Sequence, residues 1–100
     1  MLLSRLQEYI LLELSQKGGR VDRKIFRTFY ETQNKKPKQE YLEHIITQSI
    51  ERLIDRELLT GFGRRTPHKW FITHVGLTLV GAKIVKEIYQ RRQRKLPFRR

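Results

Sequence analysis

Apolar residues between positions 42 and 54 recur with the period of an α-helix, and this feature constrains the fold most. The residues of this stripe are Leu42, Ile45, Ile46, Ile50, Leu53 and Ile54. The spacing predicts an amphipathic helix over residues 38–57. Two β-prone runs follow at 58–63 and 68–73, with Arg64-Arg65-Thr66-Pro67 between them. This pattern predicts a β-hairpin with a positively charged tip.

A second helical stripe opens the chain, and it consists of Leu3, Leu6, Ile10 and Leu14. It predicts a helix over residues 2–16, which the Gly18-Gly19 pair ends. Leu11 and Leu12 lie off the stripe. A helix that is apolar on more than one face is buried on more than one side. In so small a protein, a second subunit can provide that second side.

The segment between these two helices carries further start signals. Val21 forms either a short strand or a plug of the core. Asp22 is a good N-cap for a helix over residues 23–32. Pro37 suits the first position of the helix over 38–57.

A final helix ends near Arg92, and its start has two equivalent readings. Thr73 follows Ile72 and Thr78 follows Leu77, and each Thr precedes a glycine, Gly76 or Gly81, by three residues, as a strand end, a cap and a first turn would. We favour Thr73 because Leu77 then joins the apolar stripe of this helix. The rest of that stripe is Val80, Ile84, Val85 and Ile88.

Length and composition predict one small globular domain. The chain has 100 residues, 38% of them hydrophobic, which suffices for a compact core. We expect a folded domain over residues 1–92 and a flexible basic tail over 93–100. The absence of Cys excludes disulfides and thiolate metal sites. No apolar run approaches the roughly 18 residues that a membrane span needs.

Positive charge is the second strong signal, because the net charge is +12. A small, foldable domain of this kind typically binds a polyanion, most often nucleic acid. The last ten residues, which begin at Arg91, carry six positive charges and no negative one. Three clusters lie inside the domain: Arg20, Arg23, Lys24 and Arg27; Lys35, Lys36 and Lys38; and Arg64, Arg65 and Lys69.

The chain carries no pattern of an enzyme. His44, His68 and His74 lack the spacing of a metal-binding helix motif, and His68 and His74 are too far apart along a strand to share a metal. The serines lie in no nucleophile motif, and the glycines form no phosphate-binding loop. We therefore expect no catalytic residue, no metal site and no cofactor.

Aromatic residues in the hairpin allow two interpretations. Trp70 and Phe71 are neighbours on a strand, so one faces the core and the other faces solvent or a partner. Stacking on unpaired bases is the functional alternative to core packing. Phe62 either contacts nucleic acid or pins the hairpin.

The order of elements is that of a winged helix-turn-helix domain: helix, short strand, helix, helix, hairpin, helix. Residues 46–59, from Ile46-Thr47-Gln48-Ser49 to Leu58-Leu59, resemble the end of a recognition helix of the MarR or PadR type. Residues 70–76 resemble a second wing strand that leads into a Leu-Thr-x-x-Gly helix start. The resemblance covers roughly residues 20–90. It departs from the family at Glu57, where Gly is usual, and the chain lacks long flanking dimerisation helices.

The resemblance implies an α+β, mostly helical winged helix-turn-helix fold with a three-helix core, a β-hairpin wing and a C-terminal helix. In this fold the third helix enters the major groove and the wing contacts the backbone or the minor groove. Gln, Thr and His side chains there can read base edges, while Lys and Arg bind phosphates. The DNA-binding residues that we predict are Arg23, Lys24, Lys35, Lys36, Lys38, Gln39, His44, Thr47, Gln48, Arg64, Arg65 and Lys69.

The predicted recognition helix is itself acidic, because residues 38–57 carry five acids and three bases. Phosphate contacts must then come from the flanking clusters, and the acids could reject wrong sites. Alternatively, the helix carries stabilising charge pairs around Glu51, Arg52, Asp55 and Arg56 and reads nothing.

These observations predict sequence-dependent or nucleoid-type binding of double-stranded DNA by a small transcriptional regulator. We expect a homodimer through the first and last helices, located in the cytoplasm with the nucleoid, or in the nucleus of a eukaryote. Two alternatives remain: an RNA-binding, ribosome-associated winged helix, and a protein-interaction module. An anionic membrane surface is a weaker option for the helix that runs into 91–95.

Overall fold

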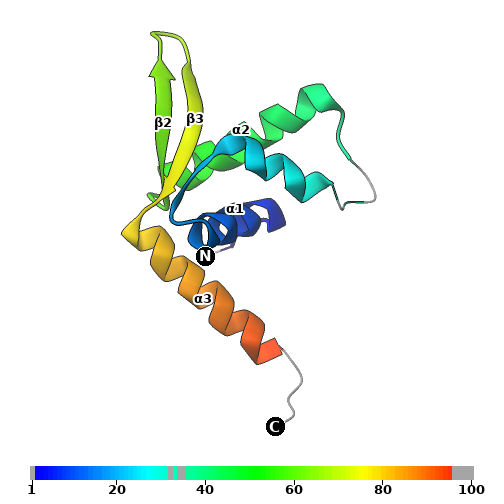
Figure 1. Cartoon of the computed structure of the whole chain (residues 1–100), viewed down its shortest axis with the longest axis vertical. Coiled ribbons are helices and arrows are strands. Elements are labelled where there is room, and N and C mark those ends of the chain that lie inside the picture. The colour runs from blue at the N-terminus through cyan, green and yellow to red at the C-terminus, as the bar shows by residue number, and fades with distance from the viewer. Residues whose placement is uncertain (1, 32, 34–35, 96–100) are drawn as a thin grey trace.

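The computed structural model describes residues 2–31, 33 and 36–95. A three-stranded sheet stands beside a group of helices, and the last helix runs away from the base of the hairpin (Figure 1). The elements are α1 (Arg5–Gln16), β1 (Arg20–Asp22), the 3₁₀ helix η1 (Arg23–Tyr30), α2 (Gln39–Asp55), β2 (Leu59–Arg65), β3 (Trp70–Leu77) and α3 (Leu79–Lys95). This order is the one that the sequence predicts.

Helix α1 begins later than expected because Ser4 caps it. The Ser4 hydroxyl accepts a hydrogen bond from the Gln7 amide, and the Gln7 side chain accepts one from the Ser4 amide. The two bonds satisfy amides that have no partner inside the helix. At the other end Gly19 donates to the Leu14 carbonyl at 2.7 Å, and both Gly18 and Gly19 have positive φ angles. The glycine pair ends α1 as predicted.

Strand β1 and helix η1 follow with one difference from the prediction. Asp22 caps η1 through its carboxylate, which accepts from the Lys24 amide at 2.9 Å. Val21 lies in a strand, which settles the choice between strand and plug. The next segment, however, is a 3₁₀ helix of eight residues that ends at Tyr30, not an α-helix that reaches residue 32. Phe26 is its one fully buried side chain.

Helix α2 carries the predicted stripe into the core, where Leu42, Ile46, Ile50 and Leu53 are buried. Its N-cap is Lys38, so Pro37 precedes the cap and does not take the first helical position. At the C-terminus, the Leu58 amide donates to the Leu53 carbonyl at 2.9 Å, and Glu57 has a φ of 64°. Glu57 therefore adopts the left-handed conformation that Gly usually supplies at a helix end.

The hairpin strands are longer than expected. Arg64 and Arg65 belong to β2, so the turn at the tip consists of residues 66–69 and the predicted arginine tip is wrong. The Thr66 hydroxyl closes this turn by accepting from the Lys69 amide and donating to the Lys69 carbonyl, each at 3.0 Å. The arginines are paired into the ladder because the register continues to Arg65 opposite Trp70.

Strand β3 lies between its antiparallel neighbours β1 and β2 and contains a bulge. Phe62 pairs with His74 and Gly63 pairs with Ile72, which leaves Thr73 unpaired. The extra residue shifts the alternation, so Ile72 and Val75 both point into the core although they are three residues apart. A Cβ at Gly63 would lie 1.9 Å from the Phe71 carbonyl oxygen, so the strand requires Gly at this position.

Helix α3 begins at Thr78, and the favoured start at Thr73 is wrong. The Thr78 hydroxyl accepts from the Gly81 amide at 2.9 Å and donates to the Glu57 carbonyl at 2.7 Å. Thr73 lies inside β3, because that strand pairs with β1 as far as Gly76 and with β2 as far as Leu77. The helix continues to Lys95, past the expected end near Arg92, and the last part of the predicted tail, 96–100, lies outside the described residues.

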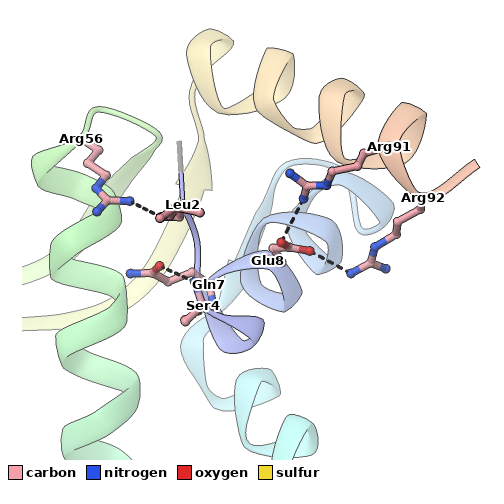
Figure 2. A network of polar contacts seen from close by, with 7 residues as sticks. All are labelled: Leu2, Ser4, Gln7, Glu8, Arg56, Arg91 and Arg92. Atoms are coloured by element: carbon pink, nitrogen blue, oxygen red, sulfur yellow. Dashed lines mark hydrogen bonds and ion pairs between the residues drawn. The ribbon is translucent and has the colours of Figure 1, made fainter. Parts of the chain in front are cut away.

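The first helix is covered by its own chain. Leu11 and Leu12, which lie off the α1 stripe, are fully or nearly fully buried together with Val85 and Ile88 of α3. A second subunit is therefore not needed to bury the second face of α1. Arg91 and Arg92 reach from α3 to the two carboxylate oxygens of Glu8, at 3.0 and 3.1 Å (Figure 2).

Within the described residues, no helix has the length and apolar character needed to span a membrane.

Candidate nucleic-acid interface

The outward face of α2 carries two of the predicted base-reading residues, His44 and Gln48, which are exposed because the buried stripe occupies the opposite side of the helix. Thr47 is half-buried at the edge of this face. Gln39 is exposed in the first turn, but it lies on the side of the buried stripe and lines a cavity with Leu42, Arg27 and Tyr30. All four predicted base-reading residues belong to one rigid element, so their relative positions are fixed.

Arg23 and Thr47 are joined to each other. The Arg23 guanidinium, only 16% exposed, donates to the Thr47 hydroxyl at 2.7 Å and to the Glu43 carbonyl at 3.2 Å. Burial lowers the pKa of Arg23 from its ordinary value, against the opposing effect of the Glu43 carboxylate. Arg23 therefore ties η1 to α2 and offers little free surface to a phosphate.

Glu43 takes part in the same junction. Its carboxylate lies 3.6 Å from the Arg23 guanidinium and also accepts a hydrogen bond from Arg27. Two cations thus neutralise the acid that lies between the predicted readers His44 and Thr47 on one side and η1 on the other. The sequence placed Arg23 and Arg27 in a phosphate-binding cluster; no local pattern signals this ion pair, because Glu43 belongs to a different element.

Three other acids of α2 remain on its surface. Glu40, Glu51 and Asp55 are exposed, and among the described residues no ion pair joins them to a base. Arg56, which we considered as a partner within the helix, donates instead to the Leu2 carbonyl at 3.1 Å (Figure 2). The face that would meet DNA is therefore polar and acidic, and phosphate-binding charge must flank it.

Lysines flank the N-terminal end of α2. Lys24 on η1 and Lys36 and Lys38 before α2 are exposed, as the prediction requires of phosphate-binding groups. Lys35 lies outside the described residues.

The wing supplies positive charge beside the C-terminal half of α2. Arg65 lies over the Trp70 ring, with its guanidinium carbon 4.2 Å from the ring centre. Arg65, Trp70, Glu51 and Asp55 line one cavity between the wing and α2. Arg64 lies on the opposite face of the strand, near Phe71. Trp70 packs against the core and Phe71 is 41% exposed, as the alternation of the two residues predicts.

A second cavity lies where η1, α2 and β3 meet. Its volume is about 380 Å³, and Lys24, Arg27, Glu43 and His74 are among its lining residues. The His74 ring nitrogen lies 3.9 Å from the Asp22 carboxylate. Within the described residues, no group of three or more His, Asp or Glu side chains is placed to hold a metal ion.

Comparison with known proteins supports the fold. The chain is similar to the crystal structure of the adhesin competence repressor AdcR from Streptococcus pyogenes, with a TM-score of 0.54 and 22% identity. The match covers 95% of this chain and 69% of that chain. No family model matches, and neither does any curated protein. At this identity the likeness concerns the fold alone: the chain has an α+β winged helix-turn-helix fold.

Proposed function

We propose that the protein binds double-stranded DNA as a small transcriptional regulator related to the MarR and PadR types, with α2 in the major groove. One observation carries this proposal: the outward face of α2 lies between two basic regions. Lys24 of η1 and Lys36 and Lys38 before α2 are exposed on one side, and Arg65 of the wing lines a cavity beside α2 on the other. A duplex that received α2 would therefore meet positive charge on both sides of the groove.

The residues divide into readers and phosphate-binding groups. Gln39, His44 and Gln48 are the exposed candidates for base edges, because Gln can bond adenine through two atoms. The Thr47 hydroxyl is held by Arg23, so in this proposal its methyl group, and not its hydroxyl, contacts a thymine methyl. The phosphate-binding groups in this proposal are Lys24, Lys35, Lys36, Lys38, Arg64, Arg65 and Lys69, with Arg23 as the residue that positions α2.

The acids of α2 give the proposal a selective element. Glu40 lies one turn before His44, and a carboxylate there accepts from the amino group of cytosine but repels phosphate and base acceptors. An unpaired carboxylate in a groove opposes binding wherever no such donor is present. Sequence preference would then come partly from rejection of wrong sites.

We further propose a homodimer, now through α3. The basis for an interface on α1 is weaker than the sequence suggested, because its apolar residues are buried within the chain. On α3, Leu79 is 86% exposed and Val80 is 49% exposed, which leaves apolar surface at the start of the helix. Sedimentation velocity tests this interface. Val80→Glu should convert a dimer to a monomer, whereas a wild-type monomer at all concentrations would contradict the proposal.

The experiment for DNA binding is selection of preferred sequences from a random duplex library, followed by anisotropy titration with single-stranded RNA as competitor. Gln48→Ala should lose about 1–3 kcal/mol of discrimination for the selected site and keep its affinity for random DNA. Gln90→Ala, an exposed glutamine on α3, is the matched control. RNA that competes better than duplex, or a selection that enriches nothing, would contradict this function.

The proposal places the protein with the chromosomal DNA, whether in a nucleoid or in a nucleus.

A further inference from the structure

The sheet has a face turned away from the helical core, and this outer face carries aromatic rings that the duplex proposal does not use. Gly61 shows which side is inward, because a Cβ there would touch Trp70 and Ile54. Residues opposite each other in an antiparallel pair share a face. By this register the outer face comprises Arg20, Asp22, Thr60, Phe62, Arg64, Phe71, His74 and Gly76.

Phe71 is a ring placed between two cations. Its side chain is the exposed one of the Trp70–Phe71 pair, and Arg64 lies opposite it on β2. The Arg64 guanidinium carbon lies 5.5 Å from the ring centre and the Lys69 ammonium 5.0 Å. Both lie within the roughly 6 Å over which a cation interacts with a ring. A planar apolar surface and two positive charges are thus presented together to solvent.

Phe62 lies on the same outer face near the base of the hairpin, but its ring is half-buried. The Arg20 guanidinium carbon lies 3.9 Å from the centre of the ring. The ring also lies against Gly76, where an added Cβ would approach Phe62 to 3.2 Å. Phe71 is therefore the exposed ring of this face, and Arg20 adds a third cation beside it on the sheet.

We propose that this outer face binds the unpaired bases of single-stranded DNA, with Phe71 as the stacking surface and Arg64, Lys69 and Arg20 as phosphate contacts. Aromatic rings beside cations on an open sheet bind single strands with little regard to sequence, because every base offers a flat face. Base pairs in a duplex offer no such face, because each is stacked between its neighbours. Charge complementarity favours nucleic acid: three cations and one half-exposed acid, Asp22, lie on the part of this face that the structure describes.

The choice of DNA over RNA rests on the proposed function. A protein with α2 in a duplex groove meets single-stranded DNA wherever that duplex is locally opened or ends. The wing would then hold one separated strand while α2 stays on the paired segment.

Anisotropy titration with an oligothymidine of about 15 nucleotides tests the proposal, since such a length spans a typical single-strand site. Phe71→Leu keeps the apolar bulk and removes the ring. It should weaken oligothymidine binding about fivefold to a hundredfold, the range expected for one lost stacked base. Affinity of this variant for a blunt duplex should stay within about twofold of wild type.

Tyr89→Leu is the control, because Tyr89 is an exposed aromatic of α3, on a different element from the sheet. It should leave oligothymidine binding unchanged, and circular dichroism checks that each variant is folded. Oligothymidine binding that is absent in wild type, or equal in wild type and Phe71→Leu, would overturn the proposal. An oligouridine that bound more than about tenfold tighter would overturn the choice of DNA. Binding of oligothymidine without binding of duplex supports the outer face and contradicts the proposed function, so the two failures are distinguishable.

Discussion

Glu57 ends α2 in a conformation that suits glycine. Its φ of 64° lies in the left-handed region, which disfavours a residue with a Cβ by roughly 1–2 kcal/mol. The turn is nevertheless closed, because the Glu57 amide donates to the Ile54 carbonyl at 2.9 Å and Thr78 donates to the Glu57 carbonyl. The departure from the family pattern at this position therefore changes the strain of the turn and leaves its geometry intact.

Glu57→Gly should raise the free energy of unfolding by about 0.5–1 kcal/mol, since the gain in the left-handed turn exceeds the added freedom of the unfolded chain. Glu51→Gly is the matched control, because the same substitution in the exposed middle of α2 should lower it by about 0.5 kcal/mol. Urea denaturation measures both. Equal signs for the two variants would contradict the assignment of strain to Glu57.

Helix caps and stops at single residues could be predicted where they depend only on neighbouring residues in the sequence. The Gly18-Gly19 stop and the Asp22 cap were predicted from the chain and are confirmed. Ser4 was missed, although Ser followed by Gln three residues later is a capping signature. Thr73 was preferred to Thr78 because Leu77 would then join the apolar stripe of the last helix, whereas the length of β3 depends on pairing with two other strands, which no local pattern shows.

At the scale of elements, Arg23 is the tie between η1 and α2. Its guanidinium donates to a hydroxyl and a carbonyl of α2 while largely buried. Arg23→Met keeps the stem and removes both donors, which should lower the free energy of unfolding by about 1–3 kcal/mol. Lys24→Met, at the exposed neighbour, should change it by less than about 0.5 kcal/mol.

A double-mutant cycle separates the tie from general loss of packing. Arg23→Met and Thr47→Val should show a coupling energy of at least about 0.5 kcal/mol, because each removes one end of the same hydrogen bond. Additive effects within error would mean that the two residues do not stabilise each other.

A second contact between elements, that between α1 and α3, consists of exposed ion pairs. Glu8 receives Arg91 and Arg92, whose side chains are about half exposed. Exposed pairs contribute little and are screened by salt. Glu8→Gln should therefore lower stability by less than about 1 kcal/mol at low ionic strength, and the difference should vanish near 1 M salt, where screening acts within a few ångström.

Thermal unfolding at two salt concentrations measures this effect, with Glu87→Gln on the exposed side of α3 as control. A loss in the Glu8 variant that persists at high salt would show that packing, and not charge, holds the end of α3 on α1.

The order of elements was predictable because each carries its own periodicity, whereas the contacts between elements were not. The period of 3.6 in α2 and the two β-prone runs are local patterns. That Arg64 and Arg65 are paired strand residues follows from a register, and that Arg23 and Arg27 meet Glu43 follows from packing. Part of the predicted phosphate-binding cluster therefore has a structural role.

At the scale of the whole molecule, the apolar residues outside the stripe of α1 did not indicate correctly what covers them. Leu11 and Leu12 were read as candidates for an interface between subunits, yet both are buried in the core that α3 helps to close. Helix α3 covers α1 only because α3 begins after the hairpin returns to its base (Figure 1). A small domain with four helical segments can thus bury more than one face of one helix.

The net charge of the whole molecule is +12, although the face of α2 is acidic. Attraction to a duplex must therefore come from positive charge outside α2. In the proposed function, the wing and the lysines that flank α2 neutralise the phosphates. Each neutralised phosphate contributes about −0.9 to the slope of log Kobs against log salt concentration for B-form DNA.

The most direct test is that slope, measured by anisotropy on a random duplex of about 30 base pairs, a length chosen to exceed a site one helical turn across. Replacement of both Arg64 and Arg65 by Ala should reduce its magnitude by roughly 2, since two phosphate contacts are lost. Replacement of both Lys83 and Lys86, exposed on α3, removes the same charge and should leave it unchanged. A slope that falls equally in both double variants, or no duplex binding at low salt, would contradict the account.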